Sequence, residues 1–277
     1  MRDGLLGRLL RTLTGLLGLA AAASVAGGAP AARDLAVDLE LVLAVDVSGS
    51  VDEVEGKLQR DGYVQAFRHR DVVSAISGGL TRRIAAVYIE WAGHETQATL
   101  VDWRVIDSES AAIAFAREIE TAPATRGRYT SISQAIRYAI PKFNGNGFEG
   151  TRRVIDISGD GANNSGGLVP VARDEAVALG ITINGLPIVN DRPNRFGRQL
   201  PGLDLYYRDC VIGGPGAFMV VADDFPSFAE AIRRKLVLEI SDRAPPSPPR
   251  PLLRRAQLDA PPCDSGERRL RRMFMDP

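Results

Sequence analysis

Segments typical of strands and segments typical of helices alternate along most of this chain, and this alternation constrains the fold more than any other feature. Apolar runs typical of buried strands lie at 37–47, 84–91, 153–158 and 181–186. Amphipathic helical patterns lie between or after them, at 51–67, 108–120, 131–140, 169–179 and 227–240. The alternation predicts an α/β fold with a doubly wound, mostly parallel sheet, right-handed crossovers and helices on both faces.

One connection is too short for a crossover helix. A Gly-His-Glu-Thr turn at 93–96 joins the segment 84–91 to a further strand-like segment at 98–105. Because so short a link is typical of a hairpin, the sequence predicts one antiparallel edge strand on the otherwise parallel sheet. A glycine-rich turn precedes a last strand-like segment at 217–221.

Composition favours one main globular domain, which we expect over residues 32–241. The chain has 277 residues, of which 45% are hydrophobic and 25% charged, enough for one sizeable core. Lys and Arg number 34, and so do Asp and Glu, so the formal net charge is zero. No overall attraction to nucleic acid or to an anionic membrane follows from this balance.

The N-terminus has the features of a signal peptide, predicted at 1–31. Arg2, Arg8 and Arg11 precede an apolar stretch at 13–26, and Ala29-Pro30-Ala31 offers a small-x-small cleavage site. A retained membrane anchor is the alternative, but the apolar stretch is shorter than the ~20 residues of a spanning helix. We therefore expect a bacterial protein, periplasmic or secreted, with no membrane span after cleavage.

Residues 242–277 differ in character from the rest of the chain. Proline pairs and arginine clusters replace apolar periodicity, so a flexible, disordered Pro/Arg-rich tail is predicted. Export would bring Cys210 and Cys263 into an oxidising compartment. An intramolecular disulfide, free thiols and an intermolecular bond all remain open, since Cys263 lies in this tail.

The stretch Asp46-Val47-Ser48-Gly49-Ser50 follows the first apolar run directly. It places one carboxylate and two hydroxyls at a strand-to-helix turn, and such oxygens are hard ligands suited to a divalent cation such as Mg²⁺. The alternative is that Ser50 caps the next helix, since Ser50 and Glu53 also have the spacing of a capping box.

Two further loops carry oxygen ligands at the same predicted edge of the sheet. Thr130 precedes the helix at 131–140, and Asp160 follows the strand at 153–158. Ligands of open α/β sheets bind outside the carboxyl ends of the strands. We therefore predict a cation site, although Thr130 could also cap its helix and Asp160 could shape a turn. Its residues are Asp46, Ser48, Ser50, Thr130 and Asp160.

The combination of Asp-x-Ser-x-Ser, a threonine in a second loop and a later Asp-Gly resembles the metal-ion-dependent adhesion site of von Willebrand factor A domains, and the resemblance spans residues 37–240. It implies direct contacts to Mg²⁺, Mn²⁺ or Ca²⁺ from the hydroxyls of Ser48, Ser50 and Thr130, with Asp46 and Asp160 acting through water. It also implies a protein partner whose acidic side chain completes the coordination. This chain departs from the pattern at Gly159, directly before Asp160, where that family often has Ser or Thr.

The C-terminal half resembles a narrower group, bacterial exported von Willebrand A-like proteins of unassigned function. The resemblance rests on the segments at 184–188, 206–207 and 211–218 and on the closing helix at 228–240. It implies a fold and a site without naming a partner.

A magnesium-dependent phosphatase of the haloacid dehalogenase type is the enzymatic alternative. The loop at 159–164 is similar to the late acidic loop of that family, and Asp46 would be the nucleophile. That family normally has an acid/base aspartate where this chain has Ser48, and an aspartate where it has Asn164. We therefore expect a protein-binding module that is not an enzyme.

Overall fold

A five-stranded sheet forms the centre of the structure, a computed structural model that describes residues 33–189, 199–243 and 259–275. Its strands lie in the order β4–β3–β2–β6–β7. Only β3 and β4 pair in antiparallel fashion, and β4 is an edge strand. The predicted doubly wound sheet with one antiparallel edge strand is confirmed. The strands are β2 (Glu40–Asp46), β3 (Ile84–Trp91), β4 (Gln97–Ile106), β6 (Arg153–Gly159) and β7 (Thr182–Pro187).

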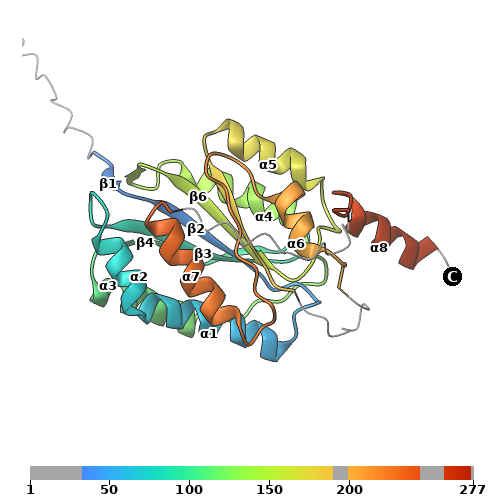
Figure 1. The fold of residues 1–277 in the computed structure, drawn as a ribbon, viewed down its shortest axis with the longest axis horizontal. Helices are drawn as coiled ribbons and strands as arrows, with labels where there is room; N and C mark the ends of the chain where they lie inside the picture. Colours follow the sequence, from blue (N-terminus) through green and yellow to red (C-terminus); the bar gives the residue numbers. More distant parts are fainter. Residues whose placement is uncertain (1–32, 190–198, 244–258, 276–277) are drawn as a thin grey trace, which may run out of the picture. The chain divides into compact units, whose positions relative to one another are not determined.

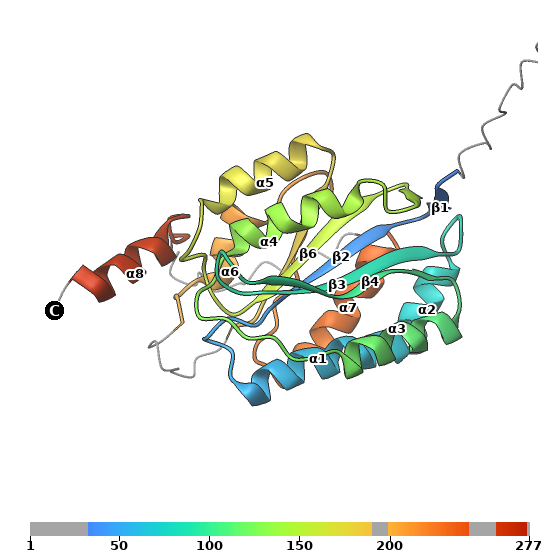
Figure 2. The same ribbon diagram turned by 180° about the vertical axis from the view of Figure 1, so that it is seen from behind.

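Helices cover both faces of this sheet, as Figures 1 and 2 show. The helices of one face are α1 (Glu53–Arg68), α2 (Arg70–Ser77), α3 (Glu109–Thr121) and α7 (Phe228–Ile240). The helices of the other face are α4 (Ile132–Ala139), α5 (Val169–Ala178) and the short α6 (Leu203–Tyr206). A 3₁₀ turn, η1 (Ile140–Phe143), continues α4, and a π-helical turn, η2 (Tyr207–Val211), continues α6. The sequence patterns did not predict α2, α6 or η2.

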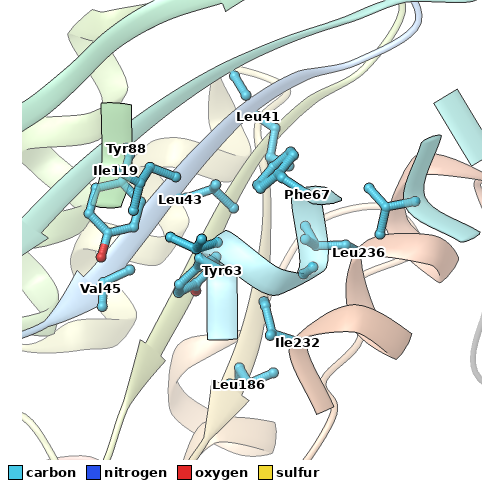
Figure 3. Close-up of a cluster of buried hydrophobic side chains, with 14 of the residues drawn as sticks. Leu41, Leu43, Val45, Tyr63, Phe67, Tyr88, Ile119, Leu186, Ile232 and Leu236 are labelled. Atoms are coloured by element: carbon cyan, nitrogen blue, oxygen red, sulfur yellow. The ribbon is translucent and has the colours of Figure 1, made fainter. Parts of the chain in front are cut away.

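Strand β2 shows why the sheet is buried on both faces. Its side chains alternate between two apolar clusters, since successive residues of a strand point to opposite faces. Leu41, Leu43 and Val45 belong to the cluster beneath α1 and α7, shown in Figure 3. Val42 and Ala44 belong to the cluster beneath α4 and α5. A strand that is apolar on both faces is typical of a parallel sheet covered by helices.

A buried charged cluster ties α7 to the sheet. Lys235 of α7 is fully buried, with its Nζ 2.6 Å from Oδ1 of Asp156 on β6 and 3.3 Å from Oε1 of Glu239. Asn184 of β7 donates a hydrogen bond to the same Glu239 oxygen over 2.6 Å. Since a buried ion is tolerated only when it is paired, each member depends on the others.

Outside the central sheet, β1 (Leu35–Val37) pairs with β5 (Phe148–Gly150) in a small parallel sheet. The segment predicted as a strand at 217–221 is not one. Met219 makes only an isolated bridge with Gly185, and Ala222 makes another with Ile188. This segment therefore runs parallel to β7, bonded to it at separate points and without a continuous ladder. The glycine-rich turn before it carries Gly214 and Gly216 at positive φ.

The predicted disordered tail is wrong for part of its length, because helix α8 (Ser265–Met275) lies within it. A disulfide attaches the start of this helical segment to the domain: Cys210 and Cys263 are bonded, with their Cα atoms 5.5 Å apart. Asp264 and Arg268 add an ion pair of 2.7 Å across the first turn. Residues 244–258 and 276–277 of the predicted tail, like the predicted signal peptide at 1–31, lie outside the described residues.

No helix among the described residues has both the length and the apolar character of a transmembrane span.

Candidate metal centre

The five residues predicted from the sequence meet at one edge of the sheet. Strand β2 ends at Asp46, and its parallel neighbour β6 ends at Gly159, directly before Asp160. Asp46 and Asp160 therefore lie at the carboxyl ends of two adjacent parallel strands. The strand order also reverses here, because β3 and β4 lie on one side of β2 whereas β6 and β7 lie on the other. In open α/β sheets such a reversal opens a crevice for ligands.

Asp46 is fully buried and held by its own loop. Its Oδ1 accepts a hydrogen bond from the backbone N–H of Ser48 over 2.7 Å. Its Oδ2 is buried without a hydrogen-bond partner among the described residues. A Cβ at Gly159 would lie only 2.9 Å from that oxygen. The glycine at 159, which departs from the adhesion-site pattern, therefore avoids a close contact with the Asp46 carboxylate. The departure therefore has a steric reason in this chain.

The hydroxyl groups form a continuous row beside the two carboxylates. Oγ of Ser48 lies 3.0 Å from Oγ of Ser50, and the hydroxyl of Thr130 donates to Ser48 over 3.2 Å. Ser50 donates to Oδ1 of Asp160 over 2.6 Å. Thus the predicted residues are linked into one hydrogen-bonded cluster drawn from three loops.

Helix α1 does not begin at Ser50. Asp52 is its N-cap and forms a capping box with Glu55, with hydrogen bonds of 2.8 and 2.9 Å. The alternative in which Ser50 and Glu53 form the capping box is wrong, and the physical reason is that a carboxylate two residues later accepts the free amides. The Ser50 hydroxyl is thereby left to face Asp160.

Two asparagines that sequence reasoning did not assign to the site hold its loops together. The side-chain oxygen of Asn164 accepts a hydrogen bond from the backbone N–H of Thr130 over 2.9 Å. The backbone N–H of Asn164 donates to the Thr130 carbonyl oxygen over 2.8 Å. Asn163 accepts from the amide of Ser133 over 3.0 Å and so supplies a cap for α4. The Asn163-Asn164 pair directly after Asp160-Gly161-Ala162 was visible in the sequence, but its partners come from another loop.

The electrostatics of the cluster disfavour the charged form of both carboxyl groups. Burial raises the pKa of Asp46 well above its usual range, and the neighbouring charge of Asp160 raises it further. Burial also raises the pKa of Asp160 to about 6, against the hydrogen bond from Ser50, which lowers it. In both carboxyl groups burial is the largest cause, because the charged form is poorly solvated away from water.

These residues fit a hard divalent cation. The donors are all oxygens, two from carboxylates and three from hydroxyls, and one buried carboxylate oxygen has no described partner. The described residues contain no group of three or more His, Cys, Asp and Glu side chains that could hold a metal. Any cation here would therefore depend on the hydroxyls of Ser48, Ser50 and Thr130.

Comparison with solved structures places the fold in a known class. The chain is similar to proximal thread matrix protein 1 from the mussel byssus, with a TM-score of 0.54 and 14% identity over 76% of this chain and 49% of that one. One structure of that protein is described as having a zinc-occupied MIDAS motif. The pilus adhesin SpaC from Lactobacillus rhamnosus GG matches with a TM-score of 0.52 and 13% identity, over 76% of this chain and 31% of that one. This chain thus spans about half of the mussel protein and less of the adhesin. The class is a von Willebrand A-like fold.

Within this class the chain belongs to the family described as "Protein of unknown function (DUF1194)", whose profile matches residues 36–244. No curated protein matches it by sequence.

Proposed function

We propose that this protein is an exported adhesion-type module that binds a protein partner through a divalent cation, Mg²⁺, Mn²⁺ or Ca²⁺. Ser48, Ser50 and Thr130 would contact the cation directly, and Asp46 and Asp160 would balance its charge. A carboxylate of the partner completes the coordination. The single observation that carries the proposal is the hydrogen-bonded cluster of three hydroxyls and two buried carboxylates at the switch point of the sheet.

The arrangement suits binding better than phosphoryl transfer. Asp46 is fully buried, and one of its oxygens is already engaged by the Ser48 amide, whereas a nucleophile must reach its substrate. The residue two positions after it is Ser48, a poor proton donor at neutral pH. These two features favour a module without enzymatic activity over a phosphatase.

Export is supported by the disulfide. A bond between Cys210 and Cys263 is typical of an oxidising compartment such as the periplasm or the cell exterior. It agrees with the signal peptide expected at 1–31, and cleavage near Ala32 is part of the proposal. Mass spectrometry of the protein recovered from its native host tests it, because an intact N-terminus on the mature protein would contradict export by this route.

The test of the proposed function is Mn²⁺ binding measured by calorimetry on the oxidised protein. Wild type should bind one cation, and Asp46→Asn should abolish binding while the protein remains folded by circular dichroism. The control is Asp107→Asn, which removes an exposed carboxylate before α3 and should bind like wild type. Folded wild type that binds no Mn²⁺ or Mg²⁺, or Mn²⁺-dependent release of phosphate from p-nitrophenyl phosphate, would contradict the proposal.

A further inference from the structure

Helix α8 is fastened directly to the loop that carries Asp160. The disulfide from Cys263 holds its start against η2, and Nδ2 of Asn163 donates to Oε1 of Glu267 over 2.7 Å. The contact is close, since a Cβ at Gly266 would lie 2.0 Å from the Asn163 carbonyl oxygen. Figures 1 and 2 both show α8 beside α6, at the end of the sheet opposite β1.

This contact creates a pocket between α8 and the candidate metal centre. The pocket has a volume of about 250 Å³, and Ser50, Thr130 and Asp160 line one side of it. Leu270, Met273 and Phe274 of α8 line another side. Met273 is 49% exposed and Phe274 is 67% exposed, so an apolar surface stands open beside a polar site.

The rest of the lining includes two basic side chains among neutral residues. Arg128 and Arg269 both line the pocket, and neither forms an ion pair with any carboxylate that the structure describes. Arg128 instead lies over the ring of Tyr129, at 5.4 Å from its centroid. A guanidinium group pairs well with a carboxylate, because its N–H donors match the two oxygens. The pocket thus combines positive charge with apolar surface.

We infer that α8 is the wall of the binding site that selects the partner, and that the ligand is a peptide segment in which an acidic residue stands beside a large apolar residue. The inference rests on the proposed function and deepens it. The acidic side chain reaches the cation between Ser50, Thr130 and Asp160, while its neighbour covers the α8 side chains. The volume, below the ~300–1,000 Å³ of drug-sized ligand sites, fits one or two side chains of a peptide.

The test uses three synthetic tetrapeptides with blocked ends and a fluorescent label, in saturating Mn²⁺. Their sequences are Gly-Asp-Phe-Gly, Gly-Asp-Gly-Gly and Gly-Asn-Phe-Gly, and fluorescence polarisation gives each Kd. Partial burial of one phenylalanine should tighten binding about tenfold, so Asp-Phe should bind about tenfold better than Asp-Gly. The Asn-Phe peptide should bind far more weakly than Asp-Phe, because the carboxylate is missing.

Variants then assign the preference to α8. Met273→Ser and Leu270→Ser should bring the ratio of the two Kd values toward one. The matched control is Leu179→Ser at the end of α5, which removes a side chain 53% exposed outside the pocket and should keep the tenfold ratio.

The outcomes separate this inference from the proposed function. If Asp-Gly binds in an Mn²⁺-dependent way but wild type shows no preference for Asp-Phe, the inference fails and the proposed function stands. A preference that survives in both α8 variants also overturns the inference. If no aspartate peptide binds in an Mn²⁺-dependent way, both fail.

Discussion

Replacing the buried Lys235 by methionine should destabilise the protein strongly. Its Nζ is the positive charge between Asp156, at 2.6 Å, and Glu239, at 3.3 Å, and all three side chains are buried. Methionine preserves most of the volume, so the loss is electrostatic. Removing one partner of a buried ion pair costs about 3–5 kcal/mol, because the remaining charge stays out of water.

The pH dependence of this loss has a definite sign. Burial, the largest cause, raises the pKa of Asp156 from 3.8 to about 7 even though Lys235 lowers it. A carboxyl group whose pKa is higher in the folded than in the unfolded state contributes stability at low pH and loses it as the pH rises through the folded pKa. Without Lys235 that pKa rises further, so Lys235→Met should cost more free energy at pH 8 than at pH 5.

Guanidinium denaturation at both pH values measures the free energy of unfolding. At pH 8 the expected loss corresponds to a fall in Tm of roughly 6–20 °C for a domain of this size. The control is Lys57→Met, since Lys57 pairs with Asp61 on the surface with its side chain 73% exposed, and such pairs contribute about 0–1 kcal/mol. A loss below about 1 kcal/mol for Lys235→Met at pH 8, or one independent of pH, would refute the reasoning.

Three further predictions concern the candidate metal centre and α8. Mn²⁺ affinity, measured by calorimetry, should fall as the pH is lowered through about 6. Burial raises the pKa of Asp160 to about 6, so below that pH its carboxylate binds a proton in place of the cation. An affinity that does not change between pH 5 and 7 would contradict this. Reduction of the Cys210–Cys263 disulfide, which spans 53 residues, should lower the free energy of unfolding by up to about 4 kcal/mol in guanidinium denaturation. An unchanged value would show that the disulfide adds nothing to stability. Gly266→Ala should lower Tm, because the added Cβ would lie 2.0 Å from the Asn163 carbonyl oxygen and overpacking costs about 1–3 kcal/mol. The control Gly56→Ala should not lower Tm, since its added Cβ would make only an ordinary contact of 3.8 Å. Equal Tm values for the two variants would argue against the α8 contact.

Much of the fold could be predicted because its signals are local. The apolar run ending at Asp46 is a strand in any context that covers both faces, and the short link at 93–96 leaves room only for a hairpin. The same locality placed Thr130 and Asp160 at strand or helix ends. Parallel strands then bring those ends together without further information, so the composition of the candidate site was accessible from the sequence.

Contacts between distant segments were not accessible in this way. Whether Cys210 and Cys263 form a disulfide depends on the distance in space between two positions 53 residues apart in the sequence. Helix α8 was missed because its apolar positions at 270, 273 and 274 are few among arginines. Such a short segment is helical when it has something to pack against.

The sequence by itself determined the strand and helix order, the doubly wound class and which oxygen donors stand at the carboxyl edge, since each follows from periodicity or from residues a few positions apart. Only the tertiary structure decided which helix Asn163 caps and that α8 forms a wall of the pocket. The physical reason is that hydrogen bonds and packing between loops depend on distances in space, which a one-dimensional pattern does not contain.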